Sequence, residues 1–305
     1  MATLPIFIGT QGLNTKIDPA RLYKNGGIQD LAIAADIDVG DTGRISRRKG
    51  YTKRISDIPV HSLFCDDGLC LFVTGTSLCS LNPDYTYTVL ATVTENARLS
   101  CVEINSRIYW LNGNERGYVT DINNPWVKGT YIGPATKRNL VSPPIGTIVE
   151  YYRNRMYIAQ NNVLWYSEPG AFGAFDLVRG FFMYATDIRM VRAVEDGIYV
   201  STENHTYFLN GNSPLKFEQI KVADYPAIQW SDTKLKGSIV FRKDGGYSII
   251  EGEGISAMWM SSEGICYAGP VGFKNLTIDK ITGFPDGLTG SGLVHSNRYI
   301  GLINP

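Results

Sequence analysis

The residue types that could carry chemistry in this chain are few and scattered. Three aspartates, Asp36, Asp38 and Asp41, fall within one short stretch, and a hard cation such as Ca²⁺ needs several carboxylates in one loop. If Asp36 is position 1 of a calcium loop, however, Asp41 stands where the glycine belongs and Arg47 where the bidentate glutamate belongs. A turn-forming aspartate cluster explains the pattern better, so we expect no metal ion and no cofactor.

Residues for acid, base or nucleophilic catalysis are equally hard to assemble. The three histidines are His61, His205 and His295. None has a second histidine at a metal-binding spacing, and the chain contains no G-x-S-x-G elbow, P-loop or G-x-G-x-x-G. The glutamates that recur beside successive hairpins are Glu103, Glu150 and Glu195. We interpret them as solvent-facing strand residues, and we expect no catalytic residues and no enzymatic activity.

Positive charge is concentrated in one stretch. Against Asp41 alone, residues 41–54 contain Arg44, Arg47, Arg48, Lys49, Lys53 and Arg54. Such a cluster could contact phosphates non-specifically, through counterion release, or pair with an acidic neighbouring subunit. A solvated edge strand protected by charge explains it equally well. The whole chain has 29 Lys+Arg and 29 Asp+Glu, which argues against a polyanion binder built on bulk charge.

The elements that must position these residues are predicted to be strands. Hairpins of alternating apolar and aromatic residues begin at Gly68, Arg107, Arg155, Gly197 and Gly237, so that successive starts lie 39 to 48 residues apart. A period of about 40–50 residues made of strands is typical of a β-propeller with one four-stranded blade per period. The alternative is a β-sandwich whose hairpins recur by chance. The best helix candidate, Ile28–Ala35, spans only about two turns.

We therefore predict an all-β protein, a β-propeller of about five to seven blades forming one domain over residues 1–305. Residues 1–55 form an N-terminal segment with a basic hairpin that turns at Asp41-Thr42-Gly43, and residues 56–305 form the repeated blades. We expect the N-terminal segment to close the ring by pairing with Tyr299–Ile303. The five cysteines are odd in number and lack a C-x-x-C, which favours reduced thiols. We expect neither a signal peptide nor a membrane span.

The N-terminal segment resembles the tail nozzle and packaged-DNA stabilisation proteins of short-tailed bacteriophages. The matching residues are Gly12, Asn14, Asp18, Pro19 and Leu22, then Asp36-Ile37-Asp38, Asp41-Thr42-Gly43 and Arg47-Arg48-Lys49-Gly50-Tyr51. Two later hairpins, Arg155–Glu168 and Gly197–Gly211, also look like that family. The resemblance is strong over residues 12–51 and moderate over most of the rest.

The resemblance implies a structural propeller subunit, one of a hexameric ring at the end of the tail tube. Its partners would be other copies, portal or adaptor proteins, and double-stranded DNA that the ring retains and passes without sequence specificity. The protein would be assembled in the host cytoplasm and reside in the virion tail, with the basic cluster facing a neighbouring subunit or the lumen. The alternative from another class is a glycan-binding or glycan-cleaving propeller, similar to sialidases, that recognises a host.

Overall fold

A computed structural model describes most of the chain. The described residues are 9–22, 29–40, 43–50, 52–54, 58–66, 68–133, 138–241, 247–270, 272–283, 289–295 and 298–304. The chain divides into two compact units: a central unit, Lys53–Ala227, and a terminal unit that combines Met1–Thr52 with Ile228–Pro305. Each unit is described by itself below.

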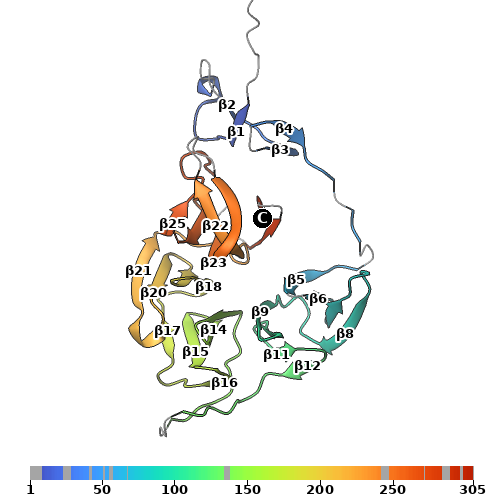
Figure 1. The fold of residues 1–305 in the computed structure, drawn as a ribbon, viewed down its shortest axis with the longest axis vertical. Coiled ribbons are helices and arrows are strands. Elements are labelled where there is room, and N and C mark those ends of the chain that lie inside the picture. The colour runs from blue at the N-terminus through green and yellow to red at the C-terminus, as the bar shows by residue number, and fades with distance from the viewer. Residues whose placement is uncertain are drawn as a thin grey trace, which may run out of the picture. The chain divides into compact units, whose positions relative to one another are not determined.

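The central unit consists of four successive antiparallel sheets, each formed by strands that follow one another along the chain (Figure 1). The first contains β5 (His61–Asp66), β6 (Leu69–Thr74), β7 (Ser77–Leu81) and β8 (Tyr87–Thr92). The second contains β9 (Ser100–Ile104), β10 (Arg107–Leu111), β11 (Arg116–Val119) and β12 (Asn123–Pro125). The third contains β13 (Ile148–Tyr152), β14 (Arg155–Gln160), β15 (Val163–Glu168), β16 (Ala171–Phe175) and β17 (Phe181–Met183), and the fourth β18 (Ile188–Val194), β19 (Gly197–Thr202), β20 (Thr206–Asn210) and β21 (Glu218–Ala223).

Tight turns set the pairing of these strands. Asn105 and Ser106, between β9 and β10, have φ of 52° and 61°, and Arg153 and Asn154, between β13 and β14, have φ of 43° and 64°. Two consecutive residues with positive φ form the type I′ turn whose twist matches that of the flanking strands. The register then pairs Arg107 with Ile104 and Tyr152 with Arg155, which places opposite residues on the same face of the sheet.

Apolar layers hold neighbouring sheets of the central unit together. Leu71 and Leu78 of the first sheet pack with Ile108 and Trp110 of the second in one buried cluster. A second cluster joins the second and third sheets, and Met156, Ile158 and Phe175 in it are completely buried. Burial at about 25 cal/mol per Å² of apolar surface makes such layers the main source of stability.

The terminal unit contains one four-stranded sheet and three two-stranded ones. The four-stranded sheet comprises β22 (Thr233–Phe241), β23 (Tyr247–Ser261), β24 (Gly264–Gly269) and β25 (Gly272–Asn275). The two-stranded sheets are β1 (Thr10–Leu13) with β2 (Gln29–Leu31), which are parallel, β3 (Ile37–Val39) with β4 (Ile45–Arg47), and β26 (Gly290–His295) with β27 (Arg298–Ile303). Two 3-10 turns, η1 (Pro19–Arg21) in this unit and η2 (Pro214–Lys216) in the central one, complete the elements among the described residues.

The all-β fold class is confirmed, and the repeated four-stranded antiparallel sheet is the blade of a β-propeller. The predicted helix is wrong, because the described part of Ile28–Ala35 contains the strand β2 and no helical turn. The described pairings join β27 to β26 and include none with the N-terminal segment. That segment approaches β27 through an ion pair instead, since Arg298 Nη1 lies 3.3 Å from Asp38 Oδ2.

The cysteines also differ from expectation. Cys65 and Cys70 stand directly opposite each other on β5 and β6 and form a disulfide, whereas Cys79, Cys101 and Cys266 are free and buried. The number and the sequence spacing of the cysteines could not reveal this disulfide, because the contact between Cys65 and Cys70 depends on the register of the β5–β6 hairpin. No helix of the described residues is long and apolar enough to cross a membrane.

Candidate functional site

The predicted basic cluster begins on the β3–β4 hairpin of the terminal unit. Arg44, Arg47, Arg48 and Lys49 are all exposed there. The turn before β4 requires glycine at position 43, because Gly43 has a φ of +75° and a Cβ would lie 2.9 Å from the backbone N and O of Thr10. Asp41 and Thr42, the other residues of the expected turn, lie outside the described residues.

One member of the cluster is paired within the unit. Asp38 Oδ1 lies 3.7 Å from Arg48 Nε, and its other oxygen contacts Arg298. Such exposed ion pairs stabilise a fold by about 0–1 kcal/mol, so the pairing fixes side-chain positions more than it adds stability. No described residue forms an ion pair with Arg44, Arg47 or Lys49.

The remaining two cations belong to the other unit. Lys53 and Arg54 are exposed residues at the start of the central unit, and the guanidinium of Arg54 lies 5.4 Å from the ring centroid of Tyr85. Cation–π contacts of this kind contribute about 0.5–1 kcal/mol at exposed sites. The six sequence-predicted residues are thus divided four to two between the units, and their joint action as one site stays a prediction.

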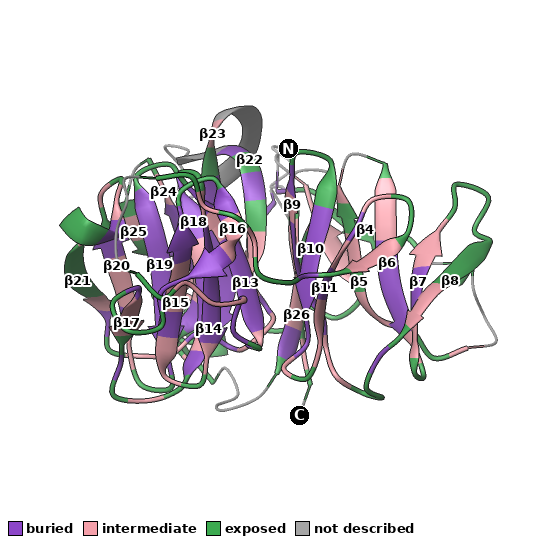
Figure 2. Ribbon diagram, turned by 90° about the horizontal axis from the view of Figure 1, so that it is seen from below, coloured by how far each residue is buried: buried purple, intermediate pink, exposed green. Residues whose placement is uncertain are grey.

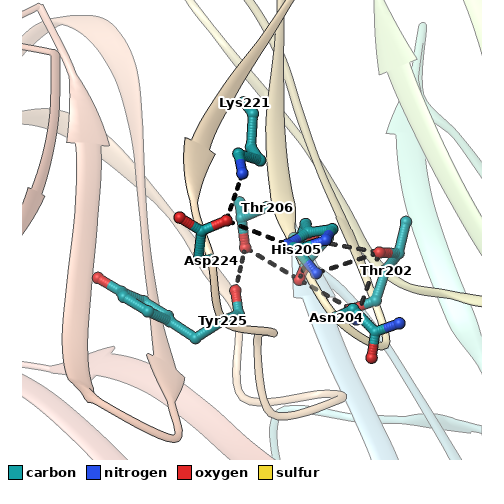
Figure 3. A network of polar contacts seen from close by, with 8 residues as sticks. Thr202, Asn204, His205, Thr206, Lys221, Asp224 and Tyr225 are labelled. Carbon is teal, nitrogen blue, oxygen red and sulfur yellow. Dashed lines mark hydrogen bonds and ion pairs between the residues drawn. The ribbon is translucent and has the colours of Figure 1, made fainter.

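A polar network at one end of the fourth sheet was not anticipated (Figure 3). His205 Nδ1 lies 3.4 Å from Asp224 Oδ1, and Lys221 donates a short hydrogen bond to the same oxygen. The hydrogen bond and charge of Lys221 lower the pKa of Asp224. Thr206 Oγ1 donates to the Tyr225 carbonyl at 3.0 Å, while Thr202 Oγ1 accepts from the His205 amide at 3.3 Å. A carboxylate beside an imidazole is the arrangement of a general base, but here it also ties the β19–β20 turn to the end of β21.

A second group combines two buried carboxylates with an arginine. Arg138 Nη1 donates a short hydrogen bond to Glu168, and its Nε lies 4.0 Å from Asp176 Oδ2. Asp176 Oδ1 also accepts from the amides of Val178 and Arg179. These contacts fix the connection between β12 and β13 against the third sheet, where the Gly129 amide donates to the Gly173 carbonyl at 2.7 Å. The geometry is that of a structural clamp.

The recurring glutamates have different surroundings. Glu103 is half-buried and Glu195 is exposed, yet Glu150 is fully buried, and our interpretation of it as solvent-facing is wrong. Arg192 Nη1 of the fourth sheet donates to Glu150 Oε2 at 3.1 Å. The partner lies 42 residues further along the chain, so spacing within one hairpin carried no signal of this pair. No three His, Cys, Asp or Glu among the described residues are grouped as metal ligands.

Comparisons with known proteins show no relative by sequence, because the chain matches no family profile and no curated protein. Several solved structures are similar. The extracellular domain of a hybrid two-component system from B. thetaiotaomicron has 13% identity and a TM-score of 0.45 over 82% of this chain, which spans only 31% of that domain. A catalytically inactive virginiamycin B lyase from Staphylococcus aureus has 10% identity and a TM-score of 0.45 over 83% of this chain and 86% of the lyase. The WD40 domain of Neurospora crassa Pan2 has 10% identity and a TM-score of 0.42 over 75% of this chain and 66% of that domain. At these TM-scores the likenesses carry no functional argument.

Proposed function

We propose that this protein is a structural subunit of a bacteriophage tail, forming an oligomeric nozzle ring below the portal and adaptor. The ring would retain packaged DNA and let it pass at ejection without reading its sequence, and the subunit would have no catalytic role. The observation that carries the proposal is the resemblance of residues 12–51 to tail nozzle proteins. The hydrogen bonds that the matching residues make in the structure support it.

Asn14 is the centre of this segment. Its side chain is 3% exposed, donates to Asp30 Oδ2 at 2.8 Å, and accepts from the amides of Lys16 and Ile17 at 3.1 and 3.2 Å. A buried amide that makes three hydrogen bonds cannot be replaced without leaving polar groups unpaired, which costs about 1–3 kcal/mol. The asparagine of the family motif therefore determines the local fold, which supports a real resemblance over a chance one.

The other motif residues act with it. Asp18 accepts from the Ala20 amide at 2.8 Å and caps η1, Pro19 is the first residue of that turn, and Leu22 is buried. The Thr15 amide donates to the Lys280 carbonyl at 2.8 Å, which anchors the segment on the terminal unit. The motif over residues 12–22 is thus an ordered segment that precedes the basic β3–β4 hairpin and is hydrogen-bonded to the rest of the terminal unit.

The electrostatics suit a tube for DNA. A lumen that bound phosphates tightly would impede ejection, because each neutralised phosphate adds to the affinity. A formal charge of zero with a few exposed cations on β3–β4 provides local contacts without a strongly attractive channel. We therefore propose that Arg44, Arg47 and Lys49 lie at an intersubunit or lumen surface.

A second candidate function rests on the group formed by Arg138, Glu168 and Asp176. Sialidase-like propellers also combine a tyrosine, carboxylates and arginines. Burial raises the pKa of the nearby Tyr166 phenol, and the negative charges of Glu168 and Asp176 add to that rise. A glycan-binding or glycan-cleaving propeller would need these groups to be reachable by substrate. Both carboxylates are more than nine-tenths buried, so we favour the structural role.

Negative-stain imaging and native mass spectrometry of the purified protein, alone and with a portal and adaptor complex, test the proposal. An annular oligomer with an open axial channel is the expected result, and a monomer that cleaves glycans would overturn it. Reversing the charge of Arg47 and Lys49 together should lower assembly or DNA retention while the melting temperature is unchanged. Lys128→Glu, at another exposed lysine of the chain, is the matched control.

A further inference from the structure

Among the four strands that begin a sheet of the central unit, β5 is the least buried. None of its six residues is buried (Figure 2), whereas β9, β13 and β18 each contain four or five buried residues. A bulge between His61 and Phe64 interrupts its pairing with β6, and Ser62 within that bulge has a φ of 59°. A bulge disrupts the ladder locally, so fewer backbone hydrogen bonds hold β5 than hold a regular strand.

Two contacts tie β5 down near its two ends. Near the start, Ser62 Oγ accepts a hydrogen bond from the Leu99 amide at 3.0 Å. Near the other end, Cys65 forms the disulfide with Cys70, which stands directly opposite on β6. The disulfide holds the register of this end of the hairpin covalently. It is therefore a strong restraint on a strand that burial and backbone pairing hold only weakly.

The disulfide is also accessible, unlike the three free thiols. Cys65 is exposed and Cys70 half-buried, whereas Cys79, Cys101 and Cys266 are 8% exposed or less. Burial raises the pKa of the Cys79 thiol, and it raises that of Cys101 to about 12. The thiolate is the form that attacks a disulfide, so buried thiols with a raised pKa exchange poorly. An external thiol can therefore reach the disulfide while the three free cysteines stay inert.

We propose that Cys65 and Cys70 form a reversible redox latch on β5, which is open as two thiols in a reducing compartment and closed as a disulfide in an oxidising one. Exposed disulfides are more easily reduced than buried structural ones, and they are the ones that serve regulation. The choice of compartments rests on the proposed function. A tail protein is made in the reducing cytoplasm of its host and is then released into an oxidising medium. On that premise, β5 is loosely held during assembly and locked afterwards.

Closing the latch is a thiol–disulfide exchange with a low-molecular-weight disulfide such as oxidised glutathione. The Cys65 thiolate attacks one sulfur of that disulfide, forms a mixed disulfide and expels one thiolate. The Cys70 thiolate then attacks the Cys65 sulfur, forms the intramolecular bond and expels the second thiolate. The two protein thiols lose two electrons, which reduce the external disulfide, and their two protons pass to the expelled thiolates. Opening is the reverse reaction, with reduced glutathione as the electron donor.

Glutathione redox buffers applied to the folded full chain test the latch. The protein is equilibrated at several ratios of reduced to oxidised glutathione, its free thiols are alkylated, and mass spectrometry measures the labelled fraction at each cysteine. Cys65 and Cys70 should pass together and reversibly between labelled and unlabelled, while the three buried thiols stay unlabelled. Amide hydrogen exchange of residues 61–66 should be about tenfold faster or more in the reduced protein. Exchange of residues 197–202, the fully buried strand β19, should not change.

Two variants separate the latch from other cysteine chemistry. Cys65→Ser holds the latch open, so exchange of residues 61–66 should be fast in reducing and oxidising buffer alike. Cys79→Ala is the matched control, because Cys79 pairs with Phe72, two residues along β6 from Cys70, and so lies on the same face of the sheet. This variant should keep the full response to glutathione. Loss of the response in Cys79→Ala would overturn the assignment to Cys65 and Cys70.

The remaining outcomes distinguish the latch from the proposed function. A disulfide that resists reduced glutathione until the protein unfolds overturns the latch. Reduction that leaves the exchange of residues 61–66 unchanged also overturns it, because the bond would then be a staple without influence on β5. A working latch in a protein that forms no ring supports the latch and overturns the nozzle alone. A ring whose Cys65 and Cys70 stay oxidised at every glutathione ratio overturns the latch and leaves the nozzle standing.

Discussion

The first and fourth sheets of the central unit have the same topology and nearly the same strand lengths, yet their surfaces differ. In the fourth sheet every residue of β19 is buried, whereas the outer strand β21 is largely exposed (Figure 2). β21 carries the charged residues Glu218 and Lys221. In the first sheet only the central residues of β6 and β7 are buried, and the outer strand β8 carries no charge. The two sheets therefore share one topology but differ in how much of each sheet is buried and in the charge of the outer strand.

The two sheets differ in how far their exposed groups are satisfied within the chain. The end of β21 is tied to the β19–β20 turn by the network of His205, Lys221 and Asp224, so backbone and charge are satisfied within the sheet. The first sheet instead leaves Leu63, Tyr87 and Val89 uncovered on one side. Apolar groups left in water stabilise nothing until another surface covers them.

The largest expected difference is in the free energy of unfolding, between replacing a buried leucine of the fourth sheet and an exposed leucine of the first. Leu209 in β20 is completely buried, so Leu209→Ala should lower the free energy of unfolding by about 2–5 kcal/mol. Leu63 in β5 is 65% exposed, and Leu63→Ala should change it by less than about 0.5 kcal/mol. Urea unfolding of the isolated protein measures both. A similar loss for both variants would mean that the first sheet is covered, and the comparison would fail.

The sequence predicted the hairpins well, because alternation and turns are local. β10, β14 and β19 begin at Arg107, Arg155 and Gly197, where the periodicity placed them. The start at Gly237 falls inside β22, because the register shifts at Lys236 and Gly237 in the middle of a strand that begins at Thr233. The helix expected over Ile28–Ala35 fails because two turns of apolar residues are too short to form a helix without tertiary support.

The contacts within the candidate sites could not be predicted, because they join distant strands. Arg138 meets Glu168 across 30 residues and Arg192 meets Glu150 across 42, so neither pair lies within one hairpin. The Cys65–Cys70 pair was missed for the opposite reason. The two residues are close in sequence, but only the register of the hairpin places them directly opposite. The basic cluster was found by composition alone, and its role stays a prediction.

The Cys65–Cys70 disulfide provides the second test of the comparison, because it stabilises the first sheet, which has more exposed apolar residues than the fourth. Closing a loop of five residues removes unfolded-state entropy worth about 2 kcal/mol. Reductant should therefore lower the melting temperature of the wild-type protein, with thiol labelling of Cys65 and Cys70 measured in parallel. The double variant Cys65→Ser/Cys70→Ser should melt at the reduced value and no longer respond to reductant. An equal response in that variant would assign the effect to another cysteine.

A smaller effect is expected from a buried hydroxyl of the fourth sheet. Ser201 Oγ accepts the Ala227 amide at 2.7 Å and is fully buried. Ser201→Ala leaves that amide unpaired and should cost about 1–2 kcal/mol in urea unfolding. The control Ser80→Ala removes a half-buried hydroxyl of β7 in the first sheet and should be nearly neutral. If both substitutions cost the same, the fourth sheet has no special dependence on its internal polar contacts.

The smallest effect is a pH dependence at the end of β21. The hydrogen bond and charge of Lys221 lower the pKa of Asp224 in the folded protein. A group whose folded pKa is depressed stabilises the fold above its unfolded pKa, about 3.9 for aspartate, and loses that contribution as the pH falls through the folded value. Because Asp224 is 71% exposed, solvent screens the interaction and only a slight shift is expected. Asp224→Asn should lower the melting temperature slightly at pH 7 and have no effect once the wild-type carboxylate is protonated.

The control is Glu195→Gln, which removes an exposed carboxylate elsewhere in the central unit that is paired with Arg153. It should give a similarly small change in melting temperature if the network of His205, Lys221 and Asp224 adds nothing beyond one surface ion pair. A larger loss for Asp224→Asn than for Glu195→Gln would show that the contacts to His205 and Lys221 act together, and that the end of β21 owes its order to them.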